Sequence, residues 1–401
     1  MASFKNKKKE DIPTAKVLSH FPLTSEDNDT PSSGDCSTWH CSFAPDESYF
    51  AWSCGNNIVS VVSWDRRRQS PVKTEEKTES PIQKPLHIYT SFKIQSIAFG
   101  STNNTNLIST AWWTRWSVSK NLVLATGHKN GYIRTWDVAT GQLILHLTDH
   151  RDSVTALSFA TNGSLLLLSC SSDHMLKIWD IIDNGNMCKT VKTSKPITTC
   201  SWSPNSKLIA SVGGNVAHIW ETNDFTLKTT LNGHHQRIIS CKFSSDNSLI
   251  ATASCDTRVI LWQVQTGQIL HIFGHFFPPP SKFSTPGKDG TWIRDLAFSQ
   301  DGIHIATIAE DGYVRFWNIL SNSENPEVIG EMDDPFCCAY SPSGSILAVG
   351  SSNGIMTFWK AETRVRPLLH FSRLAITESL QLRDLDKLYL PKRLKNYILY
   401  E

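Results

Sequence analysis

Residues 233–262 read GHHQRIISCKFSSDNSLIATASCDTRVILW, and this stretch decides the fold. Two apolar runs, 238–243 and 249–254, are separated by a polar turn, and a third run follows a second short turn and ends in Trp262. Apolar segments bounded by clusters of Ser, Asp and Asn are typical of antiparallel strands joined by tight turns. The stretch therefore predicts three neighbouring strands of one small sheet.

The same unit repeats along the chain. The 401 residues include 14 tryptophans, and seven of these close a similar apolar segment: Trp64, Trp136, Trp179, Trp220, Trp262, Trp317 and Trp359. The intervals between them are 72, 43, 41, 42, 55 and 42 residues, and a four-stranded propeller blade takes about 40–45 residues. The sequence therefore predicts an all-β, seven-bladed propeller over residues 39–360, because a closed ring gives each blade two neighbours to pack against.

Composition excludes several classes of protein. Lys and Arg number 39 against 37 Asp and Glu, which argues against nucleic-acid binding. No long apolar run and no apolar leader occur, so we expect neither membrane insertion nor secretion. Ten cysteines without a C-x-x-C pair predict free thiols, no metal and no cofactor. Cytoplasmic residence with some nuclear presence is the default expectation.

Three of the units resemble the WD40 repeat most closely, and the resemblance covers roughly residues 39–359. It implies a buried hydrogen-bonded set of His, Ser or Thr, Asp and Trp in each of these blades: His150, Ser169, Asp173 and Trp179; His234, Thr252, Asp256 and Trp262; His275, Thr307, Asp311 and Trp317. Blades two, four and seven depart from the pattern. They carry Asn130, Asn215 and Asn353 at the Asp position, and blade seven has Gly350 near the hydroxyl position.

The same residues could be drawn as catalytic triads. His150, Ser169 and Asp173 are a base, a nucleophile and an orienting carboxylate. The trio recurs in two other blades, however, and an active site is not usually built three times around one ring. Motifs for hydrolases, phosphate-binding loops and dinucleotide sites do not occur. We therefore predict that the chain is not an enzyme.

Insertions of about a dozen residues interrupt the repeat at 65–84 and 276–290, and a third lies at 101–119. The second is stiff and apolar because it holds a run of prolines beside aromatic residues. Two readings stay open for it, a contact with a partner protein and a loop folded over its own blade. The candidate target-binding residues are Phe276, Phe277, Pro278, Pro279 and Pro280.

Residues outside the repeats form two further parts. Residues 1–38 are an N-terminal tail whose apolar segment KVLSHF (16–21) is placed to supply the outer strand of the last blade. Residues 361–401 carry apolar or small residues at 368, 372 and 376, which is one face of a helix. A segment of this size buries little apolar surface alone, so we expect it to need a partner.

The tail resembles a SOCS box, a small helical module. The resemblance implies that a first helix binds elongin C, which pairs with elongin B, and that a later Leu-Pro element selects a cullin-5-type cullin with its RING subunit. Ser372 stands where that family usually has Cys, and Tyr389 where it has the first proline. The implied elongin-binding residues are Pro367, Leu368, Phe371, Ser372 and Ile376, and the implied cullin-binding residues are Leu390 and Pro391.

Propeller and tail together resemble the WD-repeat and SOCS-box proteins over nearly the whole chain. That resemblance implies the substrate-recognition subunit of a cullin-RING ubiquitin ligase, with the propeller binding an unidentified protein target. The alternative is a WD40 scaffold unrelated to ubiquitination, whose tail packs on the propeller.

Overall fold

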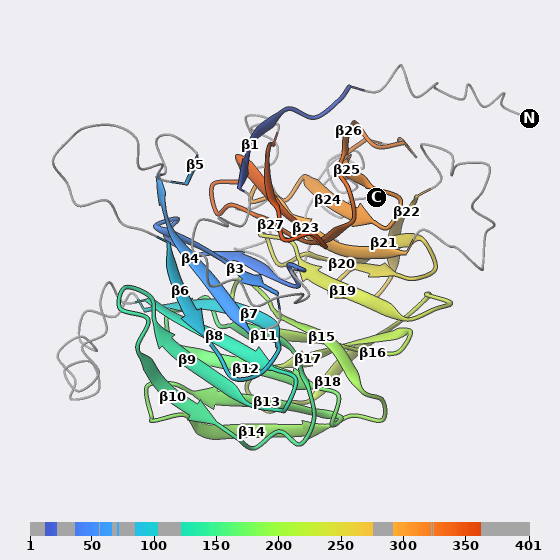
Figure 1. The fold of residues 1–401 in the computed structure, drawn as a ribbon. Coiled ribbons are helices and arrows are strands. Elements are labelled where there is room, and N and C mark those ends of the chain that lie inside the picture. Colours follow the sequence, from blue (N-terminus) through green and yellow to red (C-terminus); the bar gives the residue numbers. More distant parts are fainter. Residues whose placement is uncertain are drawn as a thin grey trace, which may run out of the picture.

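Seven antiparallel sheets form the described part of the chain, and none of its elements is a helix (Figure 1). The computed structural model describes residues 13–21, 37–55, 57–65, 70–71, 85–102, 122–275, 292–321, 323 and 325–361. Each of blades two to six is a meander of four consecutive strands. The prediction of a seven-bladed, all-β propeller is confirmed.

The strands follow one another blade by blade. Blade one contains β2 (Cys41–Phe43), β3 (Tyr49–Cys54) and β4 (Ile58–Asp65), with β5 (Ser70–Pro71) and β6 (Leu86–Tyr89) both paired to β4. Blade two contains β7 (Ile94–Ser101), β8 (Leu122–His128), β9 (Ile133–Asp137) and β10 (Leu143–Leu147). Blade three contains β11 (Val154–Phe159), β12 (Leu166–Ser171), β13 (Met175–Asp180) and β14 (Asn186–Lys192).

The remaining blades keep this order up to the last. Blade four contains β15 (Ile197–Trp202), β16 (Leu208–Gly213), β17 (Val216–Glu221) and β18 (Leu227–Asn232). Blade five contains β19 (Ile238–Phe243), β20 (Leu249–Ser254), β21 (Arg258–Gln263) and β22 (Ile269–Gly274). Blade six contains β23 (Ile293–Phe298), β24 (His304–Ala309), β25 (Tyr313–Asn318) and β26 (Val328–Glu331). Blade seven contains β27 (Pro335–Tyr340), β28 (Ile346–Ser351) and β29 (Met356–Lys360).

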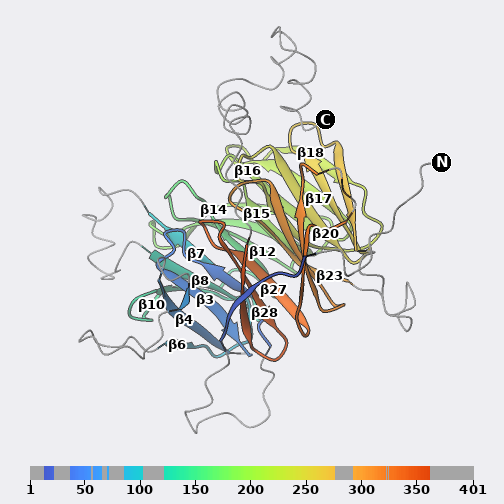
Figure 2. The ribbon, with the colours of Figure 1, turned by 90° about the horizontal axis from the view of Figure 1, so that it is seen from above.

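The outer strand of blade seven comes from the other end of the chain. β1 (Val17–Phe21) pairs antiparallel with β29, so that Val17 lies opposite Trp359 and Phe21 opposite Met356. Figures 1 and 2 show this dark blue strand beside the red strands of the same sheet. Antiparallel pairing of the first and last strands closes the ring and removes the free edge that β29 would otherwise present.

The cores lie between neighbouring blades rather than within one. Phe50 and Trp64 of blade one share a cluster with Phe358 of blade seven, and Trp317 of blade six shares one with Phe273 of blade five. The inner strands contact one another in ring order from β2 through β7, β11, β15, β19 and β23 to β27, which again contacts β2. Apolar side chains on both faces of each sheet are therefore buried against the two neighbouring blades.

Within the described residues, no helix is long and apolar enough to cross a membrane. The same part of the chain contains no group of three or more His, Cys, Asp or Glu placed to hold a metal ion.

Candidate functional site

One end of the propeller carries the turns that contain Asp173, Asp256, Asp311 and Asn353, and we call it the network face. In blade three, Nδ1 of His150 lies 2.8 Å from Oδ2 of Asp173, and its Nε2 lies 2.8 Å from Oγ of Ser169. The indole N–H of Trp179 donates to the same Oγ at 2.8 Å. The turn before β11, the middle of β12, the turn after β12 and the end of β13 are thereby joined by three hydrogen bonds.

Blade five repeats this arrangement almost atom for atom. His234 lies 2.9 Å from Asp256 and 2.8 Å from Thr252, and Trp262 donates to Thr252 at 2.8 Å. Gly233 precedes the histidine because a Cβ there would stand 2.8 Å from the ring of Trp262. The structure thus brings together all four predicted residues in both blades.

Hydrogen-bond chemistry fixes the direction of the protons in blade three. Because the Asp173 carboxylate can only accept, Nδ1–H of His150 donates to it. Nε2 of His150 then accepts from the Ser169 hydroxyl, and the oxygen of that hydroxyl accepts from the indole N–H of Trp179. Burial lowers the pKa of His150, and the Asp173 carboxylate reverses this only in part. Burial raises the pKa of Asp173, but hydrogen bonds from the Arg151 N–H and from His150 outweigh it and lower the pKa. The pair is therefore a neutral imidazole and a carboxylate.

Blade six corrects the sequence prediction. His275 lies 3.0 Å from Thr307, and Trp317 donates to Thr307 at 2.8 Å, but Asp311 does not pair with the histidine. The fully buried Arg315 stands between them, with Nη1 3.3 Å from Nδ1 of His275 and 3.1 Å from Oδ1 of Asp311.

A guanidinium has no acceptor, so Nδ1 of His275 must accept from Arg315 and Nε2 must carry the proton. This tautomer is the reverse of that in blade three. Burial, together with the Arg315 charge, holds the pKa of His275 well below its usual value. The sequence reasoning missed Arg315, which lies two residues before the blade tryptophan.

Blade two replaces the missing histidine from within its own sheet. Thr126 accepts from Trp136 at 2.9 Å and lies 3.0 Å from Nε2 of His128, which is on the same strand. Nδ1 of His128 lies 3.2 Å from the carbonyl oxygen of Phe92 and donates to it. Burial lowers the pKa of His128 to about 4, although this hydrogen bond opposes the shift.

Blade four keeps a reduced version of the network. Trp220 donates to Ser211 at 2.8 Å, and the Asn215 amide donates to the backbone carbonyl of His234 in blade five at 3.2 Å.

Blade seven has none of these partners. Val349 pairs with Thr357 in the register in which Thr252 pairs with Ile260, so Val349, not Gly350, occupies the hydroxyl position. Met332 directly follows β26 as His275 follows β22. As a result the buried indole N–H of Trp359 has no hydrogen-bond partner among the described residues.

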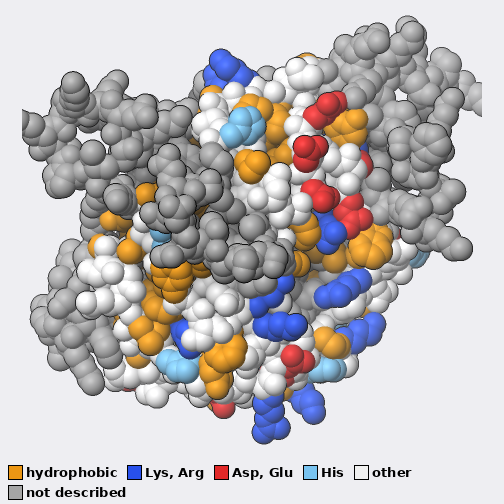
Figure 3. Space-filling view, in the orientation of Figure 1, with side chains coloured by type: hydrophobic (Ala, Val, Ile, Leu, Met, Phe, Trp, Pro, Cys, Tyr) orange, Lys and Arg blue, Asp and Glu red, His pale blue; other side chains and the backbone are white. Residues whose placement is uncertain are grey.

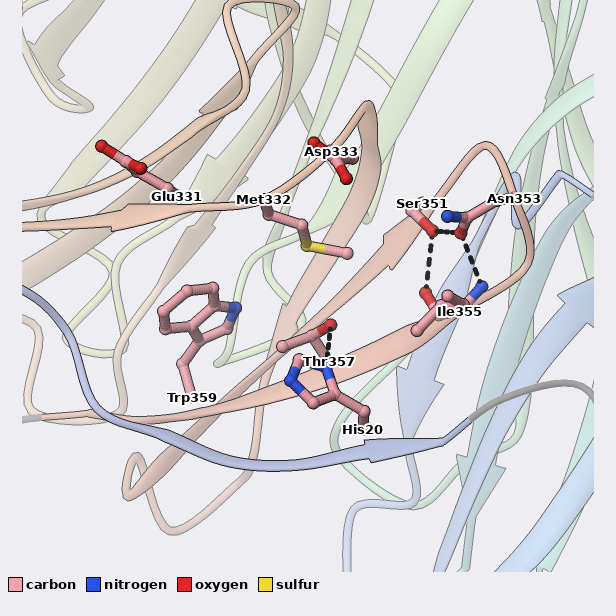
Figure 4. A pocket seen from close by; sticks show the side chains of 9 residues that line it. All are labelled: His20, Glu331, Met332, Asp333, Ser351, Asn353, Ile355, Thr357 and Trp359. Atoms are coloured by element: carbon pink, nitrogen blue, oxygen red, sulfur yellow. Dashed lines mark hydrogen bonds between the residues drawn. The ribbon is translucent and has the colours of Figure 1, made fainter.

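A pocket of about 270 Å³ lies beside this tryptophan (Figure 4). Carboxylates, small polar groups and apolar side chains surround it: Glu331, Asp333, His20, Ser351, Asn353, Thr357, Met332, Ile355 and Trp359. His20 of β1 reaches it from the closing strand, and its Nδ1 lies 3.1 Å from Oγ1 of Thr357.

Aromatic and cationic side chains also gather where the inner strands begin on the network face. The rings of Trp39 and Phe336 meet edge to face with centroids 5.2 Å apart. Nζ of Lys93 stands 3.9 Å from the centroid of the Trp39 ring, and Cζ of Arg294 stands 4.8 Å from that of Phe336. These four partly buried residues come from blades one, two, six and seven.

Three groups of predicted site residues lie outside the described residues. They are the loop residues Phe276, Phe277, Pro278, Pro279 and Pro280; the elongin-binding residues Pro367, Leu368, Phe371, Ser372 and Ile376; and the cullin-binding residues Leu390 and Pro391.

Comparison with known proteins agrees with this architecture. Five stretches match the WD domain, G-beta repeat: 141–180, 185–221, 225–263, 280–318 and 329–360. Residues 364–399 match the SOCS box. The chain is 37% identical to WD repeat and SOCS box-containing protein 1 of Xenopus tropicalis over 385 residues, which cover 90% of this chain and 91% of that protein. The protein of the same name from Takifugu rubripes is 36% identical over 429 residues, which cover 100% of this chain and 99% of that protein.

Proposed function

Because the chain belongs to the family of WD repeat and SOCS box-containing proteins, we propose that it is the substrate-recognition subunit of an elongin B/C–cullin-RING E3 ubiquitin ligase of the cullin-5 type. The match of residues 364–399 to the SOCS box carries this proposal. The propeller captures the target protein, and the C-terminal module binds elongin C. Ubiquitin is transferred by other subunits, to which this chain supplies proximity.

The course of the chain supports a division of labour between two faces. β29 begins beside the Asn353 turn on the network face and ends at Lys360. The N–H of Ala361 then donates to the carbonyl of Ser345, which lies in the turn between β27 and β28 at the opposite end of the blade. The described chain thus ends, at Ala361, on the side of the propeller away from the network face, just before the segment that matches the SOCS box. A target bound on the network face would leave that side open for the ligase.

The buried state of Ser169 supports a non-catalytic role. Its Oγ has the spacing of a nucleophile beside His150, but the residue is fully buried and Trp179 already donates to it. A substrate would reach this oxygen only if the blade opened. Blade five makes the same hydrogen bonds with Thr252 in place of the serine, as expected if the hydroxyl has a structural role in each blade.

Co-expression with elongins B and C tests the proposal. We expect Leu368→Asp to abolish co-purification of the elongins, since a charge in an apolar groove is costly to desolvate. Leu369→Asp is the matched control, because neighbouring residues of a helix point about 100° apart; it should retain the elongins. Equal retention by both variants would sink the proposal and favour a scaffold unrelated to ubiquitination.

The cullin assignment has its own test. Replacement of Leu390 and Pro391 by alanine should reduce capture of the cullin-5-type cullin while the elongins remain bound. Loss of neither, or equal capture of other cullins by the unaltered chain, would contradict this finer assignment.

A further inference from the structure

We propose that the blade-seven pocket binds a basic side chain, preferably arginine, of a protein partner. The inference deepens the proposed function, since it names the chemistry of the captured protein. The pocket opens in the blade where Met332 and Val349 stand in place of the histidine and the hydroxyl residue of blades three and five, and Met332 is one of its lining residues. Its volume is far larger than one water molecule needs.

The walls suit the stem of a long side chain. Met332, Ile355 and Trp359 are apolar and come from the turn after β26, the turn before β29 and β29 itself. Lys and Arg side chains pack their methylene groups along such surfaces and keep the charged end in water. A guanidinium can in addition stack on an indole ring.

The charges at the opening favour a cation. Glu331 and Asp333 both line the pocket and are exposed, and none of the nine described lining residues is Lys or Arg. Figure 3 shows acidic side chains gathered over the region of β25 and β26, whereas Lys and Arg lie mainly over β15–β19. Two carboxylates on one opening suit the several N–H donors of a guanidinium better than the point charge of an ammonium group.

The unpaired donor supplies an independent observation. The indole N–H of Trp359 is buried and has no hydrogen-bond partner in the part of the chain that the structure describes, and Figure 4 shows the indole nitrogen on the side of the ring that faces Met332 and Thr357. A buried unpaired donor is costly. A peptide carbonyl entering beside the basic side chain would satisfy it, once the flexible side chain of Met332 moves aside.

The test uses the full chain with ¹⁵N-labelled tryptophan indoles and three end-blocked tripeptides, in which glycine flanks arginine, lysine or neutral citrulline. We expect the arginine peptide to shift the Trp359 indole resonance saturably, the lysine peptide to bind more weakly and citrulline to have little effect. Added salt should weaken the interaction because the carboxylates are exposed. The Trp359→Phe variant assigns the resonance.

Paired variants locate the site. Glu331→Gln with Asp333→Asn should raise the dissociation constant for the arginine peptide about tenfold. Asp224→Asn, which alters an exposed carboxylate on the opposite face, should leave it unchanged. The inference is overturned if the double variant binds like the unaltered chain, if citrulline binds as well as arginine, or if millimolar peptide leaves the Trp359 resonance unmoved. Elongin capture by the same variants is measured separately, so failure here is distinct from failure of the proposed ligase role.

Discussion

Arg315 takes, beside His275, the position that a carboxylate takes beside the histidines of blades three and five. Its Nη1 lies 3.3 Å from Nδ1 of His275, and the same guanidinium pairs with Asp311. A fully buried cation thus links two groups that the repeat pattern would join directly. Its Nη2 pairs with the Asp311 carboxylate, whose side chain is 12% exposed.

We predict that Arg315→Met lowers the free energy of unfolding by about 3 kcal/mol, because it leaves Asp311 without its buried partner. Denaturant unfolding followed by tryptophan fluorescence measures this loss. Arg134→Met is the matched control at the same strand position in blade two, where no hydrogen bond or ion pair of the guanidinium is found among the described residues, and it should cost much less. Equal losses would show that the ion pair contributes nothing beyond packing.

Thr252→Val tests the blade-five network. The change preserves shape but leaves the Trp262 indole N–H without an acceptor and Nε2 of His234 without a donor. We expect a loss of about 2–3 kcal/mol in the free energy of unfolding. A loss below about 0.5 kcal/mol would contradict a stabilising role of this network.

Val349→Thr makes the reverse change in blade seven. The new hydroxyl would accept from Trp359 as Thr252 accepts from Trp262, and we expect a gain of about 0.5–1 kcal/mol. The same unfolding measurement checks it, and Thr252→Val provides the opposite sign for comparison. Destabilisation by Val349→Thr would mean that the added hydroxyl finds no partner of its own.

Acid should destabilise the propeller through His128. Its pKa is about 4 when folded and about 6.5 when unfolded. A histidine with a lowered folded pKa binds its proton first in the unfolded chain, so stability falls as pH drops from about 6.5 toward 4. At pH 5 this one residue would cost about 2 kcal/mol relative to pH 7.

The His128→Asn variant checks that assignment. It loses the hydrogen bond to Thr126 at every pH, so the comparison uses the slope of unfolding free energy between pH 7 and pH 5. We expect a shallower slope than in the unaltered chain. An unchanged slope would assign the acid sensitivity to other groups.

The repeat itself was predictable because it depends on residues that recur. Trp136, Trp179, Trp220 and Trp262 each close a middle strand, and their spacing indicates blades without any knowledge of contacts. The networks around His150 and His234 were implied by the resemblance to the WD40 repeat, and the structure contains both of them.

The exceptions depend on geometry that spacing does not reveal. Asp311 has the same separation from its tryptophan as Asp256, yet Arg315 displaces it from the histidine. His128 substitutes for a turn histidine from a strand, where the motif has no such residue. Val349 could have been found by counting ten residues back from Trp359, because blades three, five and six have Ser or Thr ten residues before their tryptophans.

The pairing of β1 with β29 also sets when the molecule can mature during synthesis. His20 and Thr357 touch across 337 positions of the chain. At about 5–20 residues per second, a ribosome takes on the order of half a minute to deliver the second after the first. During that time β1 has no partner strand, and the incomplete propeller has an unpaired strand edge to which other chains can bind. We therefore expect the need for chaperones in living cells to depend on the pairing of β1 with β29 more than on the folding of any single blade.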